Sequence, residues 1–446
     1  MTGIRVRTLP ALQGPAAWNT ILGPAPERPR LEGARTADIV IVGAGFAGLS
    51  AARRARQLEP QAVILVLDAG RIAEGSAGRN SGFMIDLPHE LTSDDYAGAG
   101  DDRAMIGLNR QAIAFAQEAV ADYRIDSHYF DRAGKVNGAA SAEAHAHNES
   151  YARHLASLGE ASEMLDAQAM ADLTGSRHYR SGLYTPGTVM LQPAGYIRGL
   201  AAGLSDAGVT IHENSAVTSL RREGTAWNVG TRSGEVSAGR VILTVNGHLE
   251  SFGFESGRLM QLFLYAVMTP ELDADALARL GGQSRWGITP ADPMGTTVRR
   301  IDTGQGGNRI VTRTCATLAP GRRIGPGQVA RAARVMQGKF EQRFPQLAGL
   351  KMAHAWAGHL CLTLNGVSVM RKLDDGLFSG CVQNGLGTAR GTLTGIGAAE
   401  LACGVDSDIT RHFTAEARPK RLPPQPFQQI GANAVLRYKE WRARAE

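Results

Sequence analysis

The sequence predicts an α/β (α+β) protein of two lobes, one with a mostly parallel sheet and one with a largely antiparallel sheet. Its 54 glycines occur as short motifs inside apolar segments, which indicates backbone lying close to a ligand. A glycine-rich turn joins an apolar strand to a helix within residues 38–58, as in a parallel βαβ unit. Between Leu259 and Thr314 the pattern changes to longer alternating strands, typical of an antiparallel sheet with one buried face.

The composition is that of an ordinary folded protein. The 446 residues are 43% hydrophobic and 20% charged, which is enough apolar sequence for a sizeable core. The net charge of +6 comes from 48 basic residues, 42 of them arginine, and the basic pairs are scattered without aromatic residues between them. We interpret the charge as solvation and expect no nucleic-acid partner.

The cysteines and apolar segments predict a cytoplasmic protein without a membrane partner. The four cysteines have no CxxC spacing and are expected to be reduced thiols. The longest apolar stretch, residues 37–52, is interrupted by glycines and is too short to cross a bilayer. His145 and His147 do not share a helical face, so no metal site is expected. The oligomeric state is not determined by these patterns.

The first element, residues 1–36, is expected to be an irregular arm. It contains five prolines, and Trp18 is expected to anchor it against the body. Hydrophobic periodicity then predicts the regular elements. Strands are predicted at residues 38–42, 63–68, 211–213, 216–222, 227–231, 241–245, 262–268, 296–302, 309–313 and 351–357. Helices are predicted at residues 46–58, 101–123, 142–158, 196–207 and 328–343, and residues 385–402 as a loop leading into a helix.

Both lobes are predicted to be discontinuous in sequence. The nucleotide-binding lobe is assigned residues 37–100, 180–257 and 350–410, and the substrate-binding lobe residues 101–179 and 258–349. Residues 411–446 are assigned to a C-terminal extension.

The turn after the first strand is a GxGxxG motif, Gly43-Ala44-Gly45-Phe46-Ala47-Gly48. Gly43 permits a tight turn, Gly45 lets the backbone approach a pyrophosphate at the helix N-terminus, and Gly48 lets helix and strand pack closely. Asp68 ends the second strand 20 residues after Gly48, the distance at which a carboxylate accepts hydrogen bonds from a ribose. In this context the motif predicts a Rossmann-like lobe that binds a dinucleotide.

A second glycine-rich loop, residues 71–82, follows the ribose carboxylate. A nicotinamide cofactor does not require such a loop. It suits a flavin dinucleotide, whose pyrophosphate and ring are wrapped by backbone N–H groups beyond the first turn. At this loop the sequence resembles the FAD-dependent D-amino-acid oxidase and sarcosine oxidase superfamily, most closely its γ-glutamylputrescine oxidoreductase branch, for which a G-x-S-G-R-N-x-G loop is characteristic.

The resemblance extends from about Asp38 to about Gly404. The further matching segments are Gln192-Pro193 followed by Tyr196, the strand and turn 241–247, Trp356-Ala357-Gly358 with Thr363-Leu364-Asn365, and Gly385-Leu386-Gly387. The chain also departs from the family pattern. Asn246 and Leu386 stand where alanine and histidine are usual, and Val367-Ser368 replaces an expected proline. No lysine occurs between Lys135 and Lys339, so the family's lysine-dependent oxygen activation is not carried over.

The resemblance implies oxidation of a C–N bond by FAD, with dioxygen or an unknown acceptor taking the electrons. Non-covalent FAD is expected, because Cys361 is off the position that the family's attachment motif would need. The expected cofactor-binding residues are Gly43, Ala44, Gly45, Phe46, Ala47, Gly48, Asp68, Ala69, Arg71, Gly75, Ser76, Arg79, Asn80, Ser81, Gly82, Val217, Asn246, Gly247, Gly358, Gly385, Leu386, Gly387 and Thr388.

The substrate is expected to be a small amine or N-substituted amino acid, with a γ-glutamylated or other carboxylate-bearing amine plausible. Arg299 and Arg313 are candidates for binding a carboxylate, and Tyr265 is a further candidate; exposed strand arginines are an equally good interpretation of the two arginines. His359 is a candidate catalytic residue or a structural histidine. Two alternatives stay open, a D-amino-acid or glycine-type oxidase and an FAD-binding component of RNA modification or assembly.

Overall fold

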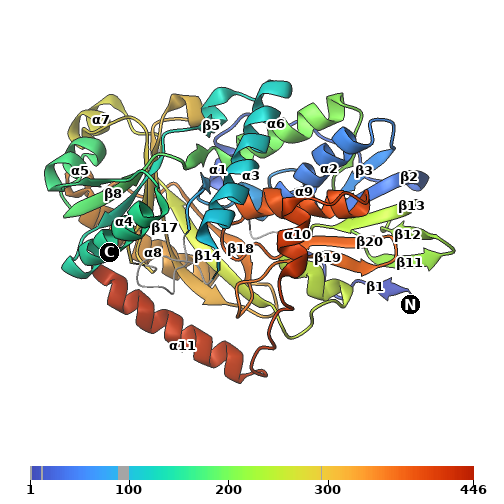
Figure 1. Cartoon of the computed structure of the whole chain (residues 1–446). Helices are drawn as coiled ribbons and strands as arrows, with labels where there is room; N and C mark the ends of the chain where they lie inside the picture. The colour runs from blue at the N-terminus through green and yellow to red at the C-terminus, as the bar shows by residue number, and fades with distance from the viewer. Residues whose placement is uncertain (1–2, 12–13, 89–99, 293) are drawn as a thin grey trace.

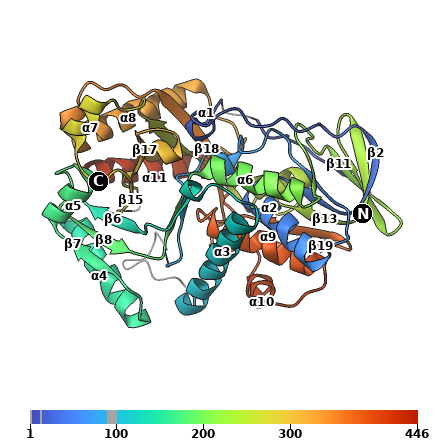
Figure 2. The same ribbon diagram turned by 90° about the horizontal axis from the view of Figure 1, so that it is seen from above.

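The computed structural model describes residues 3–11, 14–88, 100–292 and 294–446. Two large sheets form its two lobes (Figures 1 and 2). A nine-stranded sheet has the order β1-β11-β12-β13-β2-β3-β10, with β20 paired to β13 and β19 to β20. An eight-stranded sheet has the order β18-β14-β17-β16-β15-β6-β8-β7. The predicted fold class, a mostly parallel and a largely antiparallel sheet in two lobes, is confirmed.

The nine-stranded sheet is parallel from β13 to its β10 edge and antiparallel from β13 to its β1 edge, and β19 pairs antiparallel with β20. The pairs β2–β3, β3–β10, β13–β2 and β13–β20 are parallel. Its strands are β1 (Ile4–Arg5), β2 (Gly33–Val42), β3 (Ile64–Leu67), β10 (Thr210–His212), β11 (Ser219–Glu223), β12 (Ala226–Gly230), β13 (Gly234–Leu243), β19 (Val369–Asp374) and β20 (Leu377–Cys381). The helices of this lobe are α1 (Ala17–Thr20), α2 (Phe46–Leu58), α3 (Asp102–Asp122), α6 (Pro193–Asp206), α9 (Ala389–Ala402) and α10 (Asp408–Ala415).

The eight-stranded sheet is antiparallel except for the pair β6–β15. Its strands are β6 (Lys135–Ala139), β7 (Glu163–Leu165), β8 (Ser181–Thr185), β14 (Met260–Met268), β15 (Trp286–Pro290), β16 (Thr297–Ile301), β17 (Arg309–Leu318) and β18 (His354–Leu362). Helices α4 (Ala142–Leu158), α5 (Ala167–Thr174), α7 (Ala274–Leu280) and α8 (Pro326–Arg343) belong to this lobe, and α11 (Phe427–Arg442) runs along its outside (Figure 1). A small sheet of β4 (Phe83–Met84), β9 (Val189–Leu191) and β5 (Phe130–Asp131) lies apart from both.

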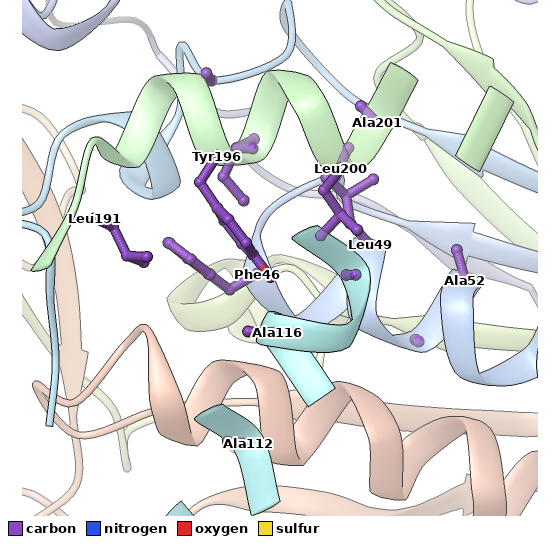
Figure 3. Close-up of a cluster of buried hydrophobic side chains, with 14 of the residues drawn as sticks. Phe46, Leu49, Ala52, Ala112, Ala116, Leu191, Tyr196, Leu200 and Ala201 are labelled. Carbon is purple, nitrogen blue, oxygen red and sulfur yellow. The ribbon is translucent and has the colours of Figure 1, made fainter. Parts of the chain in front are cut away.

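The core beside the first glycine motif is built from small, aromatic and leucine side chains of α2, α3 and α6 (Figure 3). The rings of Phe46 and Tyr196 stack with their centroids 5.9 Å apart. A Cβ atom added at Gly395 would lie 2.1 Å from the carbonyl oxygen of Ala47, so α9 and α2 approach as closely as two helices allow. This packing fixes the N-terminus of α2, on which the site depends.

The predicted boundaries differ from the observed ones at several places. Helix α3 packs in the lobe of the nine-stranded sheet, although residues 101–179 were assigned to the substrate-binding lobe. Strand β8 belongs to the eight-stranded sheet, although residues 180–257 were assigned to the nucleotide-binding lobe. β18 pairs with β14 along nine residues of the eight-stranded sheet, although residues 350–410 were assigned to the other lobe, and the strand expected at 351–357 begins at His354.

The arm includes β1, which pairs with β11, and Trp18 is fully buried as expected of an anchor. Within the predicted range 37–100, residues 89–99 lie outside the described residues. Helices α2 and α4 have the predicted bounds.

None of the helices that the structure describes is long and apolar enough to cross a bilayer.

Candidate functional site

A cavity of about 350 Å³ is lined by residues of both large sheets. One part of its wall comes from the glycine motif between β2 and α2, the end of β3 and the turn after β13. Another part comes from β14, β17 and β18 of the antiparallel sheet. A ligand in this cavity therefore contacts both lobes.

The N-terminus of α2 opens into the cavity without a side-chain cap. Its N-cap, Gly45, lines the cavity, and a Cβ atom added there would meet only the Cβ of Ala77, at 3.6 Å. Gly48 has a different role, because its Cβ would lie 1.7 Å from the carbonyl oxygen of Gly43. The first N–H groups of a helix lack intrahelical acceptors, so this end fits a diphosphate.

Asp68 is held at the end of β3 by two backbone donors. Its Oδ2 accepts a hydrogen bond from the amide of Ala44 at 2.7 Å, and its Oδ1 accepts one from Gly70 at 2.9 Å. Burial raises the pKa of this carboxyl, and the two backbone hydrogen bonds oppose that shift. Each oxygen keeps a further lone pair, so the carboxylate fits the hydroxyl groups of a ribose.

Arg79 closes the second glycine-rich loop on itself and ties it to two other segments, β18 and the arm. The guanidinium donates to the carbonyl of Glu74 at 2.7 Å, to that of Ala357 in β18 at 3.0 Å, and to that of Gly14 in the arm. Burial lowers the pKa of Arg79, and the nearby Glu74 opposes this shift. Asn80 folds the end of the loop by accepting from the amide of Gly82 at 2.7 Å.

The turn after β13 carries a buried polar atom that no described residue satisfies. Asn246 lines the cavity with φ at 48°, and its Oδ1 has no hydrogen-bond partner among the residues that the structure describes. Buried polar atoms in native proteins are almost always paired. This orphan and the uncapped α2 are the two observations that favour a bound cofactor.

His359 and His248 form a neutral pair in the cavity wall. Their ring centroids lie 5.6 Å apart. Gln261 donates through its Nε2 to the carbonyl of Gly247, so its Oε1 is the acceptor for His359 Nε2, at 2.9 Å. The imidazole of His359 is therefore protonated at Nε2. Burial, followed by the charges nearby, lowers the pKa of His359 to about 3 and that of His248 to about 4.

Arg313 lines the cavity from β17 and has no acidic or hydrogen-bonding partner among the described residues. It lies opposite Ala266 of β14, which also lines the cavity. Burial lowers the pKa of Arg313. A half-buried arginine that faces a cavity without a counterion is a site for an anion, because a charge shielded from bulk water and left unpaired is costly.

Arg299 is not brought to the cavity wall. Its guanidinium donates to the carbonyls of Ser81 at 2.9 Å and Leu191 at 2.6 Å, and lies 5.2 Å from the ring of Trp18. Tyr265 belongs to the lining, but its side chain packs in the apolar cluster under α8 and its hydroxyl donates to Thr317 at 2.9 Å.

Most of the expected cofactor residues line this one cavity. Those that do are Gly43, Ala44, Gly45, Phe46, Ala47, Asp68, Ala69, Arg71, Gly75, Ser76, Arg79, Asn80, Ser81, Val217, Asn246, Gly358, Gly385 and Gly387. Those outside the lining are Gly48, Gly82, Gly247, Leu386 and Thr388. Leu386 packs against the cluster of Phe83, Ile85 and Met190.

The arm supplies lining residues that the sequence did not indicate. Val6, Thr8, Leu9 and Pro10 line the cavity. β1 pairs with β11, and the amides of Val6 and Arg7 donate to Thr218 and Ser251 at 2.9 Å each. Sequence spacing carries no signal for this placement, because the partners lie more than 200 residues away.

Comparison with known proteins links this site to one enzyme family. The family described as FAD dependent oxidoreductase (DAO) matches residues 38–401. A probable oxidoreductase, OrdL, of Rhizobium meliloti is 24% identical over 400 residues, covering 86% of this chain and 88% of that protein. The γ-glutamylputrescine oxidoreductase of Escherichia coli is 26% identical over 396 residues, covering 88% of both.

Solved structures have the same fold. Glycine oxidase from Geobacillus kaustophilus aligns with a TM-score of 0.68 at 16% identity, over 84% of this chain and 96% of that one. The L-amino acid deaminase of Proteus myxofaciens aligns with a TM-score of 0.67 at 13% identity, over 92% of this chain and 96% of that one.

Proposed function

We propose that this chain, which belongs to the family of FAD-dependent oxidoreductases, oxidises the C–N bond of a small amine or amino acid that carries a carboxylate. Bound FAD would supply the acceptor for a hydride equivalent from the carbon next to an unprotonated amine, and the imine formed from the substrate would be hydrolysed by water. The protein's own contribution is to position the two reactants and to keep the amine neutral.

The described residues fit FAD. The uncapped end of α2 would hold the diphosphate, Asp68 the ribose, and the second glycine-rich loop with Asn246 the flavin part. Cys361 is fully buried and its pKa is raised well above the usual range, chiefly by burial. A protonated thiol is a poor nucleophile, which supports non-covalent binding.

Arg313 is the observation that carries the substrate class. Its unpaired guanidinium lines the cavity from the antiparallel sheet, and a carboxylate is the group that this planar fork binds best. The positive charge would also lower the pKa of an amine held nearby, so that more of the amine is in the unprotonated, reactive form.

His359 contributes a neutral ring rather than a charge. With Nε2 donating to Gln261, Nδ1 is the acceptor of the imidazole and is free to receive a hydrogen bond from an amine N–H or an ordered water. A neutral ring does not repel a cationic amine on its way into the cavity.

The activity is tested on the purified protein under anaerobic conditions. We expect a yellow protein whose absorbance near 450 nm bleaches with carboxylate-bearing amines and amino acids, and much more slowly with the corresponding amines without a carboxylate. Anaerobic bleaching does not depend on the natural electron acceptor. A protein that binds FAD but is bleached equally by both groups would contradict the role of Arg313, and one bleached by neither would contradict the proposed substrates.

The two alternatives are separated in the same experiment. Turnover that requires an α-carboxylate would favour a D-amino-acid or glycine-type oxidase. γ-Glutamylated amines as the best substrates would favour an activity like that of γ-glutamylputrescine oxidoreductase. In the described residues we find no observation that favours a role in RNA modification.

A further inference from the structure

Helix α11 contacts strand β17 through polar side chains. Asn433 donates to the carbonyl of Leu318 and accepts from its amide, both at 3.0 Å. Glu440 accepts from the amide of Ala316 at 3.1 Å, and Arg437 donates to the carbonyl of the same residue at 3.1 Å. β16 pairs with β17 only up to Arg313, so these side chains occupy the open edge of β17 beyond that point.

The opposite side of α11 is apolar and exposed. The described residues include nine exposed large hydrophobic side chains, and five of them are on this helix. They are Phe427, Ile430, Val435, Tyr438 and Trp441, exposed by 73%, 67%, 53%, 57% and 59%. Figure 1 shows α11 at the outer edge of the molecule, with no element beyond it in that view. A surface helix normally places its apolar face inward, so the reversed orientation of α11 indicates a partner.

We propose that α11 pairs with α11 of a second copy of the chain, antiparallel, about a two-fold axis at Ala434. The stripe Phe427, Ile430, Ala434, Tyr438 and Trp441 has spacings of three, four, four and three residues, which read the same in both directions. In an antiparallel pair centred on Ala434, Phe427 lies against the partner's Trp441 and Ile430 against the partner's Tyr438. A two-fold interface requires such self-complementarity.

The centre of the stripe allows the close approach that this pairing needs. Ala434 and the exposed Gly431 are small, so the two helix axes can come within about 8 to 10 Å there. The larger side chains toward the ends then interleave on either side of the axis.

The charges favour the antiparallel arrangement. Lys439 and Arg442 lie at the C-terminal end of the helix and Arg444 in the turn that follows it, and all three are exposed. An antiparallel pair keeps these cations at opposite ends, whereas a parallel pair would bring the two sets together. Cations beside an apolar face also suit an anionic membrane. A membrane, however, gives no reason for the mirrored spacing.

The exposed apolar area fits a dimer that forms at moderate concentration. An aromatic side chain presents about 150 to 250 Å², so burial of the exposed parts of Phe427, Ile430, Tyr438 and Trp441, together with Ala434, removes about 500 Å² per copy. The pair then buries about 1,000 Å² in total, near the lower limit of specific interfaces. We therefore expect dissociation in the micromolar range.

The test introduces opposite charges at Ile430 and Tyr438, which the proposed pairing places against each other across the interface. Sedimentation equilibrium of the holoprotein should give twice the chain mass of 47.4 kDa at high concentration. Ile430→Asp and Tyr438→Arg should each weaken the dimer at least about 30-fold, because each places a charge against an apolar side chain. The double variant should restore it to within about 3-fold, because each Asp then meets the partner's new arginine.

Control measurements separate the proposal from misfolding and from lipid binding. Val63→Arg, at an apolar side chain 50% exposed on the other lobe, should leave the dimer intact. Flavin content should be equal in all variants, and so should the thermal unfolding midpoint when it is measured at a concentration low enough for every protein to be monomeric, since dimer formation itself raises the midpoint. A monomeric wild type, a dimer that resists both single substitutions, or a double variant that stays monomeric would each overturn the proposal. So would a monomer that binds phosphatidylglycerol vesicles and loses this binding in Ile430→Asp.

Discussion

The indole N–H of Trp356 donates a hydrogen bond to the carbonyl oxygen of Arg79 at 3.1 Å. The guanidinium of Arg79 in turn donates to the carbonyl of Ala357, the residue that follows Trp356. These reciprocal contacts join the second glycine-rich loop to β18 of the antiparallel sheet. The same guanidinium also binds Gly14 of the arm. One buried side chain thus connects both lobes and the arm around the cofactor cavity.

Removal of residues 1–10 should weaken FAD binding without unfolding the protein. The deleted segment includes four residues of the cavity wall and β1 at the edge of its sheet, whereas Arg79 keeps its acceptor at Gly14. We expect faster loss of flavin, measured as the rise of free-FAD fluorescence after dilution. A truncated protein that retains FAD as long as the full chain would show that the arm does not contribute to binding.

Gly45→Val should impair flavin binding, whereas Gly48→Ala should lower the stability of the fold. A side chain at Gly45 meets only Ala77 Cβ at 3.6 Å within the protein, but it occupies the cavity where the diphosphate is expected. We expect Gly45→Val to fold with little bound flavin, as should Asp68→Ala. At Gly48 a Cβ atom collides with the carbonyl of Gly43 at 1.7 Å, so Gly48→Ala should lower the stability of the apoprotein. Flavin content and urea unfolding of the apo forms distinguish the two outcomes.

Arg313→Met should impair the use of carboxylate-bearing substrates selectively. Hydrogen bonds to charged groups contribute about 1.5 to 3 kcal/mol, so kcat/KM should fall about 10- to 150-fold for these substrates. The same variant should hardly affect an amine without a carboxylate. Arg309→Met on the same strand is the matched control, because Arg309 pairs with Glu271 and is not part of the cavity wall. An equal loss for both substrate classes would contradict direct carboxylate binding.

The two histidines of the cavity wall, His359 and His248, should make the protein sensitive to acid. The folded state holds the pKa of His359 at about 3, below the value of 6.5 expected when the chain unfolds. Between these values the unfolded state binds a proton that the folded state does not. The free energy of unfolding therefore decreases as the pH falls below about 6.5, by about 3 kcal/mol at pH 4 for one such group.

His359→Gln should reduce this loss, measured as the difference in urea-unfolding free energy between pH 7 and pH 4.5. Val63→Gln, which changes an exposed side chain and adds no titratable group, is the control and should keep the wild-type difference. An unchanged pH dependence in His359→Gln would show that His359 does not contribute to the acid sensitivity.

The FAD-dependent family expected from the sequence is confirmed by the family match over residues 38–401. The sequence could predict this family because the residues that identify the cofactor site lie close together in the chain. The turn at Gly43, the N-terminus of α2 and Asp68 follow one another within 26 residues and obey backbone rules that hold in any context. Helical periodicity likewise gave α2 and α4 their observed bounds, because both amphipathic faces are continuous in sequence.

The tertiary structure alone decided which strand residues face the cavity. Arg299 and Arg313 both lie on strands of the antiparallel sheet, but strand alternation does not say which face meets a cofactor. The pairing of Ala266 with Arg313 turns that arginine to the cavity, whereas Arg299 is held by Ser81 and Leu191. The arm reaches the cavity through β11, and α11 turns its polar side inward to cover β17. These placements depend on contacts between distant segments, which no local pattern encodes.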